Sequence, residues 1–355
     1  MRRTGSKIWA IACLALLVAG MGLTFGFAWY TGTEEAIEAC VAMFVSYVAS
    51  VLLHELGHLS FACATKMHIV YVKIFCFKIY EKQGKKRLGF ASPFAADETR
   101  VVPKKGGNMQ KRAALYALGG LVYGGIFLAL VLVGAILLTC IGHTNFKLWG
   151  LVPYAAYLFL LNVMPCDYAS GKTDMQIYIG MKRKEPSEQN MLAAMEIQGE
   201  LYAGKSYTEI DENLYFDLPQ LCQDEPLFAV MLDLRYHYYL EKGEFQKAAE
   251  KLNRLALSQE YLPADIVMKI AAELVYMHAV NGDLERAEDC GKCCREYLQS
   301  DTYIAKRALA AYSLAAGKTE AVLPLKEQAL ALLDKEKIRG VAKAERILLD
   351  RLSVA

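Results

Sequence analysis

The chain of 355 residues is 55% hydrophobic and 22% charged, and its charge is unevenly distributed. Residues 1–174 carry 17 Lys and Arg against 9 Asp and Glu, a net charge of +8, whereas residues 175–355 carry 23 against 29, a net charge of −6. Halves that differ this much exclude one homogeneous globule, and so apolar a composition excludes intrinsic disorder. The overall charge of +2 gives no support to nucleic-acid binding, so we expect no nucleic-acid partner.

Four apolar runs in the first half are each about as long as a bilayer core requires, roughly 20 residues in a helix. They cover residues 8–30, 36–65, 113–141 and 148–166, and only the second contains charged side chains. We therefore expect an all-α polytopic membrane protein with about four transmembrane helices, in contact with the lipid bilayer. The first run is too long for the apolar core of a signal peptide, so residues 1–35 are interpreted as an N-terminal anchor.

Lys and Arg are distributed asymmetrically about these runs, and such asymmetry sets the orientation of a protein in a bilayer. Arg2, Arg3 and Lys7 precede the first run, twelve Lys and Arg lie in residues 66–112, and four more lie in residues 172–184. With four spans, all these clusters fall on one side. We expect a multi-pass protein of the cell membrane with both termini in the cytosol.

Between the second and third runs the sequence becomes rich in β-branched and aromatic residues. Residues 69–80 are interpreted as one strand, residues 81–87 as a polar turn and residues 88–92 as a second strand, which together form a small β-hairpin. The hairpin either has no chemical role or offers an edge that pairs with an extended peptide.

The chemistry is concentrated in the sequence His-Glu-Leu-Gly-His at residues 54–58. Positions four apart share a helix face, so His54 and His58 can hold one zinc ion. Glu55 can then take a proton from a water molecule bound to that zinc. A chance match is the alternative, but ionisable side chains within an apolar helix are costly and usually functional.

A catalytic zinc site has three protein ligands and one open position. Residues 161–174, at the end of the fourth run, return to the side of the bilayer on which the two histidines lie, and they offer Asp167 and Asp174. His68 is a weaker candidate, because it lies ten residues beyond His58, where the pattern changes to strand.

These motifs resemble the site-2 protease family of zinc intramembrane metalloproteases. That family combines H-E-x-x-H on one transmembrane helix with N-x-x-P-x-x-x-x-D-G on a later helix, where the Asp is the third zinc ligand. The first motif is complete here, and the second matches at Asn162 and Pro165, but the Asp-Gly position falls on Ser170 and Gly171. An insertion in the loop would move the ligand role to Asp174.

The resemblance covers residues 36–178 and implies a zinc metalloprotease core. By that resemblance His54, His58 and Asp174 are the metal ligands, with Asp167 as the alternative third ligand. Asn162 would help to hold the substrate or an oxyanion near the zinc, and the simpler role for this side chain is a hydrogen bond between helices.

Glycine recurs in the second half at Gly243, Gly282 and Gly317, spaced 39 and 35 residues apart, each within a helix-turn-helix pattern. Tetratricopeptide repeats have a period of 34 with Gly at the turn, and residues 226–352 resemble three degenerate copies. A plain helical bundle is the alternative. We expect a linker and helical connector at residues 179–225, and a soluble α-helical repeat-like domain at residues 226–355 that offers a surface to a protein partner.

Together these features indicate a zinc-dependent intramembrane endopeptidase that uses Zn2+, with its active-site side in the cytosol. Its substrate would be a membrane protein or peptide, and Glu55 and Asn162 would be the catalytic residues. The alternative is a catalytically inactive membrane scaffold that binds protein partners through its C-terminal repeats. The complete H-E-L-G-H sequence favours the protease, and the interrupted second motif leaves room for the scaffold.

Overall fold

The computed structural model divides the chain into two compact units. The first contains residues 1–81, 86–102 and 108–188, and the second contains residues 82–85, 103–107 and 189–355. The main boundary falls after Glu188, inside the stretch interpreted from the sequence as a connector. The structure describes residues 2–82, 85–92, 98–103, 108–168, 171–258 and 262–352.

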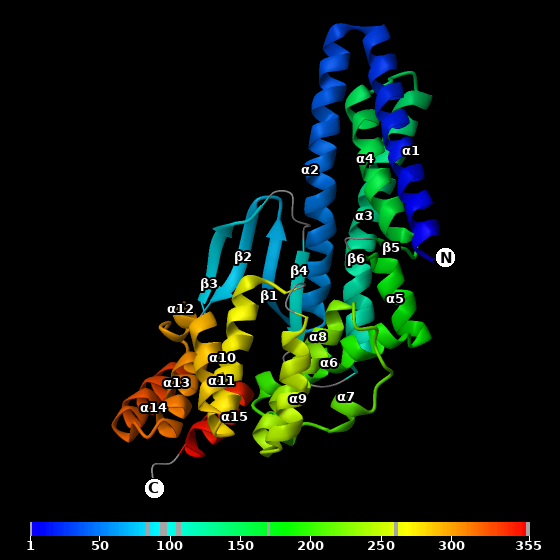
Figure 1. The fold of residues 1–355 in the computed structure, drawn as a ribbon. Helices are drawn as coiled ribbons and strands as arrows, with labels where there is room; N and C mark the ends of the chain where they lie inside the picture. The colour runs from blue at the N-terminus through cyan, green and yellow to red at the C-terminus, as the bar shows by residue number, and fades with distance from the viewer. Residues whose placement is uncertain are drawn as a thin grey trace. The chain divides into compact units, whose positions relative to one another are not determined.

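Four long apolar helices build most of the first unit (Figure 1). They are α1 (Arg2–Thr31), α2 (Thr33–Ala64), α3 (Met109–Cys140) and α4 (Phe146–Val163). Each is long and apolar enough to cross a membrane, as predicted from the sequence. Many of their large apolar side chains are exposed, which suits contact with acyl chains.

Small residues allow these helices to approach closely. A Cβ atom placed on Gly57 of α2 would lie 2.2 Å from the carbonyl oxygen of Gly119 in α3. One placed on Gly150 of α4 would lie 2.8 Å from the carbonyl oxygen of Ala39 in α2. Gly119 therefore allows the close packing of α2 against α3.

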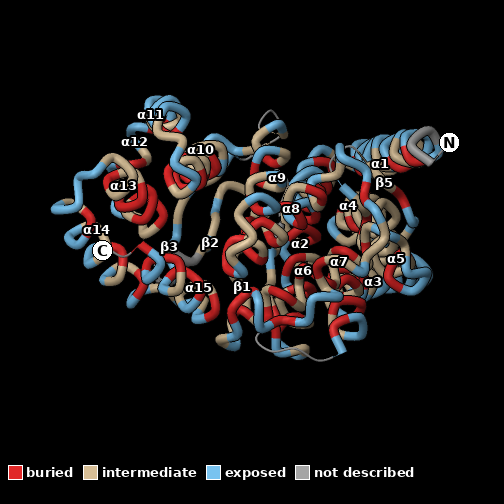
Figure 2. Tube along the Cα trace, turned by 60° about the horizontal axis from the view of Figure 1, so that its bottom comes forward, coloured by how far each residue is buried: buried red, intermediate tan, exposed pale blue. Residues whose placement is uncertain are grey.

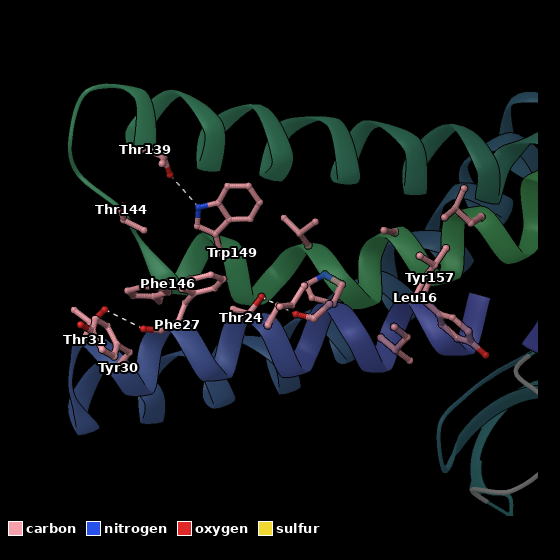
Figure 3. Close-up of a pocket in the computed structure, with 17 residues that line it drawn as sticks. Leu16, Thr24, Phe27, Tyr30, Thr31, Thr139, Thr144, Phe146, Trp149 and Tyr157 are labelled. Carbon is pink, nitrogen blue, oxygen red and sulfur yellow. Dashed lines mark hydrogen bonds between the residues drawn. The ribbon is translucent and has the colours of Figure 1, made fainter. Parts of the chain in front are cut away.

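An apolar pocket of about 810 Å³ lies between α1 and α4 (Figure 3). Some polar groups of its lining are hydrogen-bonded to one another: the hydroxyl of Thr24 donates to the carbonyl of Gly20, and the indole N–H of Trp149 donates to the hydroxyl of Thr139. The lining offers apolar surface and contains no charged side chain.

A four-stranded sheet follows α2, where the sequence predicted only a hairpin. Its strands are β1 (Met67–Ile74), β2 (Phe77–Lys82), β3 (Lys85–Phe90) and β4 (Glu98–Pro103), in the spatial order β3-β2-β1-β4. The run interpreted as one strand is in fact two antiparallel strands, with Tyr71 opposite Tyr80. The chain turns at Phe75, which adopts a left-handed φ of 55°, and an apolar turn of this kind does not interrupt the sequence pattern.

Helices make up the second unit, and three helix pairs turn on the predicted glycines. Gly243, Gly282 and Gly317 have φ values of 83°, 77° and 74°, which glycine adopts without strain at the end of a helix. The helices are α6 (Pro186–Ala203), η1 (Tyr207–Glu209), α7 (Asn213–Phe216), α8 (Pro226–Lys242), α9 (Phe245–Ala256), α10 (Ala264–Val280), α11 (Leu284–Cys293), α12 (Arg295–Leu298), α13 (Tyr303–Ala315), α14 (Thr319–Leu333) and α15 (Arg339–Asp350).

The core of this unit extends beyond the repeat-like helices. Buried residues concentrate on α8, α10 and α13 (Figure 2), and Ile197, Leu201 and Tyr215 join them from the preceding segment. Part of the stretch predicted as a linker and helical connector therefore contributes to the helical core.

A charged cluster is buried in this core. The guanidinium of Arg307 donates to both carboxylate oxygens of Glu273 at 2.7 Å, and its Nε lies 2.8 Å from Oε2 of Glu345. Arg307 is completely buried. Burial, opposed by the charge of Arg307, raises the pKa of Glu345 to about 7.

Candidate metal centre

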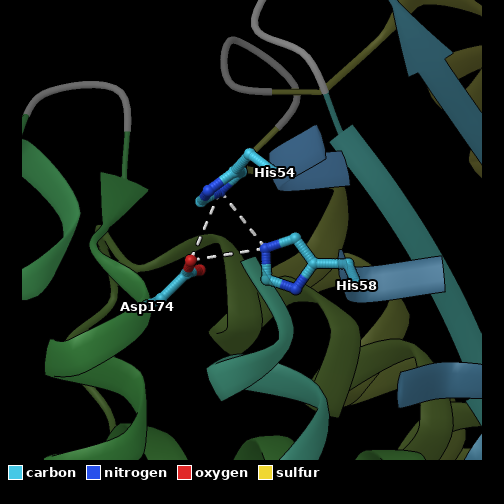
Figure 4. Close-up of side chains that lie close together, drawn as sticks. All are labelled: His54, His58 and Asp174. Carbon is cyan, nitrogen blue, oxygen red and sulfur yellow. Dashed lines mark hydrogen bonds and ion pairs between the residues drawn. The ribbon is translucent and has the colours of Figure 1, made fainter. Parts of the chain in front are cut away.

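Helix α2 supplies two histidines to one point in the first unit. His54 and His58 are one helical turn apart, so their rings lie on the same face. Their Nε2 atoms are 3.3 Å apart, and the two rings meet nearly edge to face. Both nitrogens point towards the start of α5 (Asp174–Arg183) (Figure 4).

A short hairpin after α4 brings an acidic side chain to the same point. Strands β5 (Asp167–Tyr168) and β6 (Gly171–Lys172) pair antiparallel, and the chain then enters α5. The hydroxyl of the buried Thr173 caps this helix by accepting from the amide of Gln176, and it also donates to the carbonyl of Met164. These bonds fix Asp174 as the first residue of α5.

The three side chains form a compact donor group. Oδ2 of Asp174 lies 3.3 Å from Nε2 of His54 and 3.3 Å from Nε2 of His58. Ligands placed tetrahedrally around zinc at about 2.0–2.1 Å lie about 3.3–3.4 Å from one another, so the group has the dimensions of three ligands of one zinc ion. This oxygen is buried and receives no hydrogen bond from the residues that the structure describes, as suits a cation ligand.

Asp167, the alternative third ligand, is not part of this group within the described chain. Its backbone amide donates a hydrogen bond to the hydroxyl of Ser6 in α1. The hairpin of β5 and β6 occupies the place of the insertion inferred from the sequence.

The surroundings of the histidines orient their rings. Nδ1 of His58 lies 3.0 Å from the backbone carbonyl of Tyr116, which can accept its proton and leave Nε2 as the electron-pair donor. Gly120 of α3 leaves room for both rings, because a Cβ atom there would lie 2.5 Å from Cε1 of His54 and 2.7 Å from Nε2 of His58.

Glu55 lies next to the donor group without belonging to it. Its carboxylate is buried, and Oε2 accepts a hydrogen bond of 2.6 Å from the hydroxyl of Thr99 in β4. It also interacts electrostatically with His58.

Asn162 shares a small cavity with the donor group. The cavity has a volume of about 10 Å³, roughly the space of one water molecule, and His54, Gly120 and Asn162 are among its lining residues. The side-chain amide of Asn162 donates to the carbonyl of Leu158 one turn earlier in α4. Its interaction with a substrate remains a prediction.

Thr99, Tyr116 and Gly120 were not singled out as site residues from the sequence. Thr99 is 44 positions from Glu55 and lies in a strand that the sequence did not predict. The phenol of Tyr116 in a largely apolar run was a weak signal, because Tyr123 in the same run carries the same group.

No protein-family model, curated protein or solved structure matches the chain. The geometry of these residues is therefore the basis for the function proposed below.

Proposed function

We propose that the protein is a zinc-dependent intramembrane endopeptidase that hydrolyses peptide bonds of membrane proteins or membrane-associated peptides. The observation that carries the proposal is the convergence of His54, His58 and Asp174 on one point, with pairwise distances of 3.3 Å, beside the carboxylate of Glu55. This point lies in a unit that contains four helices apolar enough to span a bilayer. Motif and geometry support the same class of reaction.

His54, His58 and Asp174 would hold the metal. Zinc, when bound, supplies Lewis acidity, which acidifies a water molecule and polarises the scissile carbonyl. Glu55 accepts a proton from the attacking water and returns it to the leaving amine. Asn162, which lines the adjoining cavity, would release the carbonyl of Leu158 and donate its side-chain amide to a substrate carbonyl. Tyr116 keeps the His58 ring in the orientation that directs Nε2 at the metal.

We further propose the orientation expected from the Lys and Arg asymmetry. Four spans would place both termini, the metal centre and the helical unit on the cytosolic side. The helical unit would then be available to a protein partner or would position substrates before cleavage.

The test compares cells that express the wild type, Glu55→Gln and Glu38→Gln. Both variants lose one carboxylate from α2, but Glu38 is a partly exposed residue paired with Lys147 at the far end of the helix. Removal of a general base lowers turnover by about two to four orders of magnitude. Glu55→Gln should cause uncleaved membrane proteins to accumulate, as measured by quantitative mass spectrometry of membranes, while zinc content stays at the wild-type level and Glu38→Gln behaves as wild type.

The scaffold hypothesis makes the opposite prediction. If Glu55→Gln cells have the wild-type membrane proteome and phenotype, while deletion of residues 226–352 abolishes the function, the protease proposal is wrong. Turnover would then be irrelevant, and binding through the helical unit would account for the phenotype.

A further inference from the structure

The carboxylate of Glu55 is held by a residue from outside the helical bundle. The hydroxyl of Thr99 in β4 donates to Oε2 of Glu55 at 2.6 Å, a short distance typical of a hydrogen bond to a charged acceptor. β4 is an edge strand of the sheet, next to β1. The strand thus brings a hydroxyl group to the proposed base from a part of the chain 44 residues away.

Tyr116 in α3 connects this strand to a metal ligand. Its hydroxyl donates to the backbone carbonyl of Thr99 at 2.5 Å. Its own backbone carbonyl lies 3.0 Å from Nδ1 of His58, and its ring packs against the His58 imidazole with centroids 5.2 Å apart. One tyrosine therefore contacts both the ligand and the strand that holds the base.

These contacts form a continuous chain from His58 through Tyr116 and Thr99 to Glu55. Fixing a glutamate side chain costs rotamer entropy, and in an unconstrained site that cost would be part of the barrier to proton transfer. Catalytic groups work efficiently only when they are held within about 0.5 Å of the productive geometry. The chain of bonds sets the base relative to the ligand before any substrate arrives.

We propose that Thr99 and Tyr116 are positioning residues that fix the carboxylate of Glu55 relative to the metal ligands. The inference rests on the proposed protease function and deepens it, because it assigns two residues that no motif contains. Thr99 acts through its hydroxyl on Glu55, and Tyr116 acts through its hydroxyl on the backbone of Thr99.

The first experiment distinguishes the effect of the Thr99 hydroxyl as a hydrogen-bond donor from the effect of the side chain's branched shape. Thr99→Val keeps the branched shape and removes the donor, whereas Thr99→Ser keeps the donor. The probe is a synthetic single-span peptide, taken from a membrane protein that accumulates in Glu55→Gln cells, reconstituted with the full-length protein in lipid vesicles. Thr99→Val should lower kcat about 10- to 100-fold with little change in KM, since small misplacement of a catalytic group costs up to about 100-fold. Thr99→Ser should stay within about threefold of the wild type, and zinc content should be equal in all three.

A double-mutant comparison tests whether Thr99 acts through Glu55. In a Glu55→Gln background, Thr99→Val should cause no further loss, because the group that it positions is gone. A full additional loss in that background would overturn the proposal and make Thr99 a purely structural residue. Wild-type kcat in Thr99→Val would overturn it as well.

Tyr116→Phe provides an independent arm with a readout other than activity. The variant keeps the ring and the carbonyl that face His58 and loses the hydrogen bond to Thr99. Hydrogen exchange of the β4 amides should become faster and kcat should fall, while zinc content stays unchanged. Tyr123→Phe is the matched control, because Tyr123 lies on the same helix and its hydroxyl donates to Ser60 instead.

Unchanged exchange and unchanged kcat in Tyr116→Phe would refute the role of Tyr116. If Glu55→Gln itself retains full activity, the proposed function fails and this inference fails with it. If instead Glu55→Gln is inactive and Thr99→Val keeps wild-type activity, only the positioning role of Thr99 is overturned and the proposed function stands.

Discussion

Replacement of Gly120 by Ala tests the metal centre without changing any ligand. The added Cβ would lie 2.5 Å from Cε1 of His54 and 2.7 Å from Nε2 of His58. Ordinary contacts begin at about 3.5 Å, so each ring must move by roughly 0.8–1 Å. Metal-ligand distances tolerate a deviation of only about 0.2 Å, and the required displacement of the rings is several times larger. We expect zinc affinity to fall at least about tenfold, while the protein remains folded because the rings can shift.

Gly134→Ala is the control, because its Cβ would meet only Leu148 at an ordinary distance of 3.6 Å. Both substitutions lie in α3 and change helix propensity by the same amount, about 1 kcal/mol in favour of Ala. The assay is zinc per chain, measured by mass spectrometry after equilibration with a graded series of chelator concentrations. Equal zinc retention by Gly120→Ala and wild type would refute the assignment of His54 and His58 as ligands.

Three other predictions concern the helical unit and the membrane orientation. Because burial raises the pKa of Glu345 to about 7, the folded state keeps a proton that the unfolded state releases above about pH 4.5, so the stability of this unit should fall as the pH rises from about 5 to 7. The protection factors of the α13 amides, which are exchange rates corrected for the intrinsic rise of exchange with pH, should fall over that range, and Glu345→Gln should remove most of this fall. A fragment of residues 189–355 should be soluble and give a helical circular dichroism spectrum; a strand-dominated spectrum would contradict its helical core. A reporter fused after Lys184 that works only outside the cytosol should be silent, and activity there would reverse the proposed orientation.

The helices of the first unit were predictable because length and apolarity suffice to define them. The sheet was only partly predictable. Ile74, Phe75, Cys76 and Phe77 are all apolar, so the turn between β1 and β2 left no mark in the sequence. The turn depends on the left-handed conformation of Phe75. The ring of Phe75 packs against the ring of Tyr47, a contact between residues distant in the sequence.

The part of the donor group that lies on one helix was predictable from the spacing of its residues in the sequence. His54 and His58 share a helix face by periodicity alone. Asp174 was favoured over Asp167 by resemblance and an inferred insertion, and the structure shows how a two-stranded hairpin and the cap of Thr173 bring that residue to the histidines. Thr99 lies outside the reach of such reasoning, because its contact with Glu55 joins segments whose pairing only the folded chain defines.

The contact between Gly57 and Gly119 has a consequence for how the motif tolerates variation. A search pattern written H-E-x-x-H treats its two central positions as interchangeable. In this chain the two positions differ in the space around them. Leu56 is 47% exposed, whereas any side chain at Gly57 would meet the backbone of α3 at 2.2 Å. A saturation library across the motif should therefore recover many apolar residues at Leu56 and almost none at Gly57, so the effective signature of this protein is H-E-x-G-H.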